Sequence, residues 1–193
     1  MGKEKDSYMH VFTQPSKDWI AHTFSAPTAV QQEAWPAIAE GGSVLISAPT
    51  GTGKTLSAFL VFVDKLQALA NQGKLKEQLY LIYVSPLKSL AQDIRENLNK
   101  PLAGIAQEPN GQGAAEITVG LRTGDTPQRD RQRMIKHPPH ILIITPESLY
   151  LMLTSTGGQT ILHTAEALII DELHALIDTK RGAHLMLSVA RLE

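Results

Sequence analysis

Residues 44–55, VLISAPTGTGKT, constrain the fold of this chain more than any other stretch. The apolar run 44–46 predicts a β-strand, a glycine-rich turn follows it, and a long helical pattern begins near Lys54. Glycines in such a turn let backbone N–H groups wrap phosphate oxygens, and the helix N-terminus adds partial positive charge. The stretch therefore predicts a loop that binds a nucleoside triphosphate.

The side chains of this loop predict how the nucleotide would be held. Lys54 would reach the outer phosphates, and the Thr55 hydroxyl would bind Mg²⁺. Ala48 stands where the general pattern has a glycine, and its small side chain still permits the turn. The positions expected around the nucleotide are Ala48, Pro49, Thr50, Gly51, Thr52, Gly53, Lys54 and Thr55. The alternative is a glycine turn before an ordinary helix with an exposed lysine.

Composition narrows the possible classes of protein. The chain has 193 residues, of which 42% are hydrophobic and 19% charged, and this predicts one globular domain. We expect a flexible N-terminus over residues 1–14 and the domain over 15–193. No apolar run or leader indicates a membrane segment, so a cytoplasmic protein is expected. The absence of cysteine excludes disulfides and thiolate metal sites, and a net charge of −1 gives no overall attraction to nucleic acid.

Several apolar runs predict buried strands of a parallel sheet. They cover residues 79–84, 140–145 and 167–170, and a shorter strand is expected at 116–120. Helical patterns follow most of these runs, with a surface loop expected at 101–113. We therefore predict an α/β fold, a mainly parallel sheet with helices on both faces and ligands at the carboxyl ends of its strands.

Hydroxyl residues recur where a strand gives way to a helix. Thr55, Ser85 and Thr145 each lie at such a point, and the last two could line up along a phosphate backbone. The alternative for the Ser85 region is a routine strand–helix connection with a solvated Lys88. Arginines are concentrated only at Arg122, Arg129, Arg131 and Arg133, where nearby aspartates favour a solvated face.

Two acids follow the apolar run 167–170. Asp171 would hold hydrated Mg²⁺, and Glu172 could take a proton from the attacking water. The alternative is an acidic helix N-terminus, which the helix dipole favours. Together with the upstream phosphate loop, the pair indicates nucleotide hydrolysis.

Gln31 also allows two interpretations. It lies three residues after Thr28, so the pair fits a capping box at a helix start. Its amide could alternatively recognise adenine through a paired donor and acceptor. Local pattern alone favours the cap.

Taken in order, these motifs resemble those of superfamily 2 DExH helicases, in their first RecA-like motor domain. The resemblance rests on the phosphate loop with Ala48 and on PTAVQ, SPLKSL, RTGDT, TPESL and DELH. Longer stretches, including SPLKSLAQDI, TPESLYLML and DELHALIDTKRGAHL, are most similar to the large helicase-related (Lhr) family. The match covers about residues 24–192.

The resemblance implies a role for each matching residue. Gln31 would recognise adenine, Glu172 would be the general base, and His174 would couple nucleotide state to strand binding. Asp171 would hold the metal through water, with Lys54 on the phosphates. The residues implied to contact one nucleic-acid strand are Ser85, Pro86, Lys88, Arg122, Thr123, Gly124, Thr145 and Pro146.

The family implies an ATP-dependent 3′–5′ DNA translocase that unwinds DNA and RNA–DNA duplexes, in association with repair. We expect ATP and Mg²⁺ as cofactors, single-stranded DNA or a DNA or RNA–DNA duplex as partner, and a second RecA-like domain beyond Glu193. The isolated domain should be nearly inactive, because the arginine finger belongs to that second domain. In related phosphoryl transfer an arginine finger raises kcat by a factor of about 10³–10⁵. The alternatives are a nucleotide-gated nucleic-acid-binding module and an RNA helicase of the same superfamily. A small-molecule kinase fits poorly, because no lid or acceptor-binding pattern is present.

Overall fold

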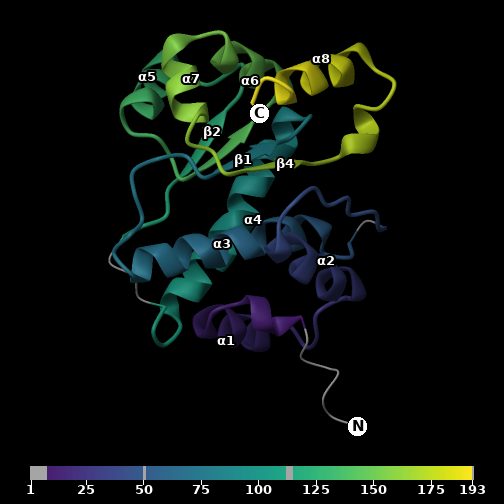
Figure 1. The fold of residues 1–193 in the computed structure, drawn as a ribbon, viewed down its shortest axis with the longest axis vertical. Coiled ribbons are helices and arrows are strands. Elements are labelled where there is room, and N and C mark those ends of the chain that lie inside the picture. Colours follow the sequence, from purple (N-terminus) through teal and green to yellow (C-terminus); the bar gives the residue numbers. More distant parts are fainter. Residues whose placement is uncertain (1–7, 50, 112–114, 193) are drawn as a thin grey trace. The chain divides into compact units, whose positions relative to one another are not determined.

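The computed structural model describes residues 8–49, 51–111 and 115–192. The chain divides into two compact units, one formed by residues 1–75 and 98–116 and the other by 76–97 and 117–193. Figure 1 shows the path of the chain. Its 3₁₀ and α-helices and strands are η1 (Met9–Val11), α1 (Gln14–Thr23), α2 (Ala29–Glu40), α3 (Lys54–Asn71), β1 (Leu81–Val84), α4 (Lys88–Gln107), β2 (Val119–Arg122), α5 (Gln128–Lys136), β3 (Ile141–Ile144), α6 (Pro146–Leu153), α7 (Thr156–Leu162), β4 (Ala167–Ile170), η2 (Leu173–Ala175) and α8 (Lys180–Val189).

The first unit is held together near its start by aromatic and polar contacts. The ring of Phe12 meets fully buried Trp35 of α2 edge-to-face, with centroids 4.9 Å apart. Thr13 precedes α1, and its backbone N–H donates to the Asp64 carboxylate of α3 at 3.1 Å. The polar composition favoured a flexible segment over residues 1–14; of these, 8–14 are described and include η1 and this buried contact. Ser16, a residue type that favours N-caps, instead lies buried within α1.

The long helix α4 corrects the loop expected at 101–113. It continues through Pro101 to Gln107, although proline removes one helical hydrogen bond. Leu98 and Ile105 lie two helical turns apart and are both buried. Burial of this apolar face therefore outweighs the local cost of the proline.

The described strands form one parallel sheet in the second unit, in the order β2-β3-β1-β4. This confirms the predicted α/β fold. The strands predicted at 79–84 and 140–145 are also confirmed within one or two residues, and Ala167–Ile170 matches its prediction at both ends. The strand expected at 116–120 begins and ends later, at Val119–Arg122. The strand expected at 44–46 is wrong: Leu45 is 80% exposed, and no described strand pairs with this segment. An apolar run becomes a strand only where a partner completes its hydrogen bonds.

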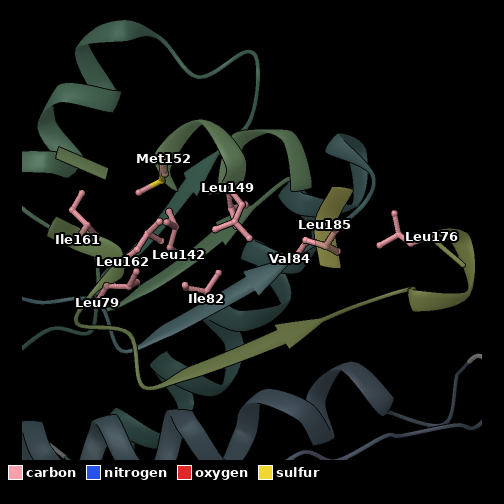
Figure 2. Packing of buried hydrophobic residues seen from close by; sticks show 11 residues of the cluster. Leu79, Ile82, Val84, Leu142, Leu149, Met152, Ile161, Leu162, Leu176 and Leu185 are labelled. Atoms are coloured by element: carbon pink, nitrogen blue, oxygen red, sulfur yellow. The ribbon is translucent and has the colours of Figure 1, made fainter. Parts of the chain in front are cut away.

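The core of the second unit lies between the sheet and the helices α6, α7 and α8 (Figure 2). Ile82 and Val84 of β1 and Leu142 and Ile144 of β3 point into it. The alternate strand residues Leu81, Tyr83, Ile141 and Ile143 point to the other face and are also buried. Both faces of the sheet are therefore covered, as near-continuous apolar strands require.

Helix α7 was not predicted, because its sequence is polar and contains two glycines. Ser155 caps it by accepting a hydrogen bond from the backbone N–H of Gly158 at 3.3 Å. Ile161 and Leu162 then anchor it in the core. None of the helices within the described ranges has the length and apolarity that crossing a membrane requires.

Candidate functional site

The phosphate loop leads into the N-terminus of α3, as predicted. Gly51 and Gly53 have φ values of +80° and +84°, which only glycine adopts without strain. The Lys54 ammonium donates to the carbonyl oxygens of Ala48 and, at 2.8 Å, Pro49. The first N–H groups of a helix have no partner within the helix, so the start of α3 offers donors to an anion.

Gln31 lies against this loop and also completes a capping box. Its Oε1 accepts from the backbone N–H of Thr28 at 2.9 Å, and its own N–H donates to the Thr28 hydroxyl at 3.3 Å. Its Nε2 lies 2.8 Å from the position that a Cβ on Gly53 would occupy. The Thr28 hydroxyl also donates to the Thr52 carbonyl oxygen at 2.9 Å. The cap is thus confirmed, and the start of α2 is fastened to the phosphate loop.

The remaining loop residues are half-buried or exposed. Thr52 donates from its hydroxyl to the Pro49 carbonyl oxygen at 2.8 Å, and Thr55 is half-buried in the first turn of α3. Thr50, also expected around the nucleotide, lies outside the described residues. The structure therefore brings together the predicted positions from 48 to 55, Thr50 apart, with Gln31 beside them.

A hydrogen-bonded row crosses the carboxyl ends of the four strands of the second unit. The N–H of Thr145 donates to the Arg122 carbonyl oxygen at 3.3 Å, and that of Ser85 to Ile144 at 2.9 Å. The N–H of Asp171 continues the row by donating to Val84 at 3.0 Å. The residues predicted to contact nucleic acid and the predicted metal ligand Asp171 therefore follow neighbouring β-strands.

The residues predicted to contact nucleic acid at and beside this row differ in how exposed they are. Ser85 and Thr145 are 0% and 2% exposed, and their hydroxyls donate internally, to the Leu87 carbonyl and the Ser148 hydroxyl. The other buried members are Pro86, Thr123 and Pro146, whereas Arg122 is half-buried and Lys88 and Gly124 are exposed.

The turn after β2 is fixed by two cations. Lys88 pairs with Asp125 at 2.9 Å, and Arg131 of α5 donates to the carbonyl oxygens of Thr126 and Gly124 at 2.7 and 2.8 Å. Thr126 does not cap α5, although its residue type would suit a cap: its hydroxyl accepts from the N–H of Thr123, and Pro127 precedes the helix. Arg131 was predicted only as part of a solvated face, so its role in the turn was missed.

Among the residues predicted to contact a nucleic-acid strand, Arg122 is the one with a perturbed pKa. Burial lowers the pKa of its guanidinium from the ordinary value, and the positive charge of Arg131 lowers it further. A cation that is partly desolvated beside a second cation gains from binding an anion. The end of β2 therefore carries two neighbouring positive charges, of which Arg122 is partly desolvated.

Asp171 is oriented by two donors. The Tyr83 hydroxyl donates to its Oδ2 at 2.6 Å from the adjacent strand β1, and the N–H of Glu172 donates to its Oδ1 at 2.9 Å. Tyr83 is 2% exposed and was predicted only as a buried strand residue. No local pattern could have revealed this contact, because the partners are 88 residues apart.

Glu172 has the unusual φ of +48°, in the left-handed region that a side chain adopts at a cost of about 1–3 kcal/mol. Its carboxylate lies 3.2 Å from Nε2 of exposed His174. Residues held in such conformations are concentrated at functional sites. The structure thus brings Asp171, Glu172 and His174 together at the end of β4.

The fit of these residues to Mg²⁺ can be judged from their donors. Both oxygens of the half-buried Asp171 carboxylate accept one hydrogen bond and retain a lone pair. Among the described residues, no group of three or more His, Asp or Glu side chains could hold a metal. Mg²⁺ in nucleotide sites is usually bound by one or two carboxylates with water and phosphates, so this donor set fits.

A further ion pair joins α6 to α8. The Arg181 guanidinium donates to both carboxylate oxygens of Glu147, with its Nη2 at 3.1 Å from Oε2. This hydrogen bonding is the main cause that lowers the pKa of the Glu147 carboxyl. The pair ties the first turn of α6, beside Thr145, to the segment after DELH, and no sequence pattern indicated it.

A family model for DEAD/DEAH box helicases matches residues 28–193. "Lhr helicase/ probable uracil glycosylase" of Mycolicibacterium smegmatis is 50% identical over 184 residues, which are 94% of this chain and 12% of that protein. "ATP-dependent helicase Lhr-Core protein 2" of Thermococcus barophilus is 45% identical over 95% of this chain and 21% of its own length. The chain thus spans about an eighth to a fifth of these relatives.

Solved structures agree with these matches. The Mycobacterium smegmatis helicase Lhr, solved bound to ssDNA and AMP-PNP, has a TM-score of 0.87 and 46% identity, over 96% of this chain and 23% of that one. The DEAD-box helicase Mss116, at 21% identity and a TM-score of 0.78, shares the fold. The resemblance to superfamily 2 helicases of the Lhr family is confirmed.

Proposed function

Because the chain belongs to the DEAD/DEAH box helicase family, we propose that it is the first RecA-like, ATP-binding motor domain of an Lhr-like ATP-dependent DNA helicase. The observation that carries this proposal is the close similarity to a helicase Lhr solved with ssDNA and an ATP analogue. The proposal extends to 3′–5′ movement on single-stranded DNA.

ATP would bind at the start of α3. The N–H groups of the glycine turn and of the first helical turn would cradle the phosphates, and Lys54 would exchange its two carbonyl partners for phosphate oxygens. Gln31 has its Oε1 engaged by Thr28, which leaves the second lone pair of Oε1 and the Nε2 donor for adenine. The cap and the adenine contact are therefore compatible.

Hydrolysis would depend on the acids after β4. Asp171, oriented by Tyr83, would hold hydrated Mg²⁺, with the Thr55 hydroxyl as a further oxygen ligand. When bound, Mg²⁺ neutralises the charge that develops on the phosphates. Glu172 would accept a proton from the attacking water, and His174, 3.2 Å away, would link that carboxylate to the nucleic-acid side.

The nucleic-acid strand would lie along the row of strand ends. Arg122, Lys88 and Gly124 reach solvent and are the direct contacts in this proposal. Ser85 and Thr145, whose side chains are buried, would shape the turns that present those contacts, together with Pro86, Thr123 and Pro146. Lys88 would share its charge between Asp125 and a phosphate.

The proposal includes a second RecA-like domain outside this chain, which supplies the remaining catalytic groups. This domain alone would then hydrolyse ATP very slowly. Since its substrates, ATP and DNA, are intracellular, a cytoplasmic location is part of the proposal. A role in DNA repair is also included, on the family resemblance alone.

Glu172→Gln in the full-length protein tests the central claim. The variant should bind ATP as wild type does and lose hydrolysis stimulated by nucleic acid, because the amide cannot accept the proton. Glu33→Gln, at an exposed carboxylate of α2, is the matched control and should keep wild-type turnover. Wild-type turnover in Glu172→Gln would refute the role of general base.

Strand displacement by the full-length protein, measured with and without ATP, separates the alternatives. ATP-dependent displacement of a DNA duplex supports the helicase. Nucleic-acid binding that responds to ATP without displacement would indicate a nucleotide-gated module. Displacement of RNA duplexes alone would indicate an RNA helicase.

A further inference from the structure

Five side chains on one side of α5 line a single shallow hollow of about 370 Å³: Arg129, Gln132, Arg133, Lys136 and His137. We call this surface the basic face. Its cations Arg129, Arg133 and Lys136 follow a spacing of four and three residues, which keeps them on one face of a helix. They extend over about 11 Å of the helix axis. Four of the five side chains can carry positive charge, in a chain whose net charge is −1.

The permanent cations of the basic face have no partner among the residues that the structure describes. Neither Arg129, Arg133 nor Lys136 makes a side-chain hydrogen bond or ion pair there. Three other cations of the same unit are engaged: Lys88 with Asp125, Arg131 with the turn after β2, and Arg181 with Glu147. Other described cations, such as Arg95 and Arg122, also lack a side-chain partner, so it is the grouping of three on one helix face that distinguishes the basic face. His137 of the face is paired with Glu77 at 2.7 Å, the one such pair that the face makes within the described part of the chain.

The other sides of α5 are already used within the unit. Met134 packs against the core, Ile135 approaches Gly157 of α7, and Arg131 donates to the turn after β2. Asp130 lines a second hollow, beside β2, which Arg133 lines as well. The basic face is therefore the side of the helix that is left for an external partner.

We propose that the basic face of α5 binds the phosphate backbone of nucleic acid outside the segment held at the strand ends. Arg131 fastens the start of α5 to the turn that carries Thr123 and Gly124. A backbone that leaves this turn meets Arg129 and then Arg133 and Lys136. The hollow is shallow and has no apolar anchor, which suits sequence-independent phosphate contacts better than a protein ligand.

This inference rests on the proposed function, and the salt dependence of binding tests it. Full-length protein with Arg129→Gln, Arg133→Gln and Lys136→Gln combined is compared with wild type by fluorescence anisotropy over a range of salt. The probes are a DNA single strand and the same strand joined to a duplex. Each duplex phosphate contact contributes about 0.9 to the slope of log Kd against log salt, so three contacts predict a loss of about 2–3. The slope should fall more for the tailed duplex than for the single strand.

The control combines Lys17→Gln, Lys74→Gln and Lys100→Gln, which removes the same charge from the first unit. It should keep the wild-type slope, and both variants should keep the basal ATP hydrolysis measured without nucleic acid. Arg133→Glu alone should lower the slope by about one or more.

Two results would overturn the inference and leave the proposed function intact: a wild-type slope in the basic-face variant, as expected if an acidic protein were the partner, or equal losses in both triple variants. Wild-type protein that binds neither probe would refute the proposed function, and the inference with it.

Discussion

Gly53→Ala tests whether the phosphate loop depends on the close approach of Gln31. The residue has φ +84°, and a Cβ there would lie 2.8 Å from Gln31 Nε2. The left-handed conformation costs alanine about 1–2 kcal/mol, of which up to about 1 is offset by lower entropy of the unfolded chain. Gln31 is only 3% exposed and its Oε1 is held by Thr28, so the overlap adds about 1–3 kcal/mol. We expect the free energy of unfolding to fall by roughly 1–5 kcal/mol.

Tryptophan fluorescence provides the assay, because both tryptophans, Trp19 and Trp35, lie in the same unit as Gly53. Urea unfolding without nucleotide therefore reports on that unit. Gly73→Ala is the control: its φ is +65°, and nothing lies within 4 Å of its Cβ position. Gly53→Ala should lose about 1–3 kcal/mol more than Gly73→Ala, and this excess isolates the contact with Gln31.

A double-mutant cycle then assigns the excess. Gln31→Ala should itself cost about 1 kcal/mol through the capping box. In the double variant Gln31→Ala/Gly53→Ala, the loss of unfolding free energy should be at least about 1 kcal/mol smaller than the sum of the two single losses. The reason is that the overlap between Gln31 and the new Cβ disappears. Equal losses at Gly53 and Gly73, or an additive cycle, would refute the reasoning.

Three further outcomes test the second unit. Tyr83→Phe should raise the Mg²⁺ concentration needed for binding of a fluorescent ATP analogue without altering Mg²⁺-free binding, because Asp171 loses its orienting donor; unchanged Mg²⁺ dependence would contradict this. Burial lowers the pKa of His140 from its ordinary 6.5, so the contribution of neutral His140 to the free energy of unfolding is complete above pH 6.5 and is lost as the pH falls; an NMR titration midpoint of His140 at or above 6.5 would contradict this. Leu142→Ala, at 1% exposure, should cost about 2–5 kcal/mol in urea unfolding followed by circular dichroism, against about 0.5 for exposed Leu151→Ala; similar losses would argue against the observed core.

The sheet could be predicted because its strands are buried on both faces. A parallel strand covered on both sides is a near-continuous apolar run, and 79–84, 140–145 and 167–170 have that pattern. The run 44–46 has it too and is not a strand in this structure. A sequence pattern shows that a segment suits a strand, whereas pairing depends on a partner that the pattern does not identify.

The site was predictable where its contacts are local. The capping box of Thr28 and Gln31 follows from a spacing of three residues, and the glycine turn follows from its composition. The contacts of Thr28 with Thr52 and of Tyr83 with Asp171 join residues 24 and 88 positions apart. They arise only when the fold brings separate elements together, so no local signal announces them.

The row of hydrogen bonds at the ends of the β-strands also bears on how a bound nucleotide and a bound nucleic-acid strand could influence each other. The N–H of Asp171 donates to Val84, directly before Ser85, and Thr145 is joined to Arg122 in the same way. Neighbouring strands in a packed parallel sheet cannot slide past one another without breaking several ladder bonds, each worth about 0.5–1.5 kcal/mol. A displacement of Asp171 by nucleotide would therefore move the turns after β1, β3 and β2 with it. Under the proposed function, coupling between the two ligands then needs no separate relay of side chains, because the sheet itself carries both sets of contacts.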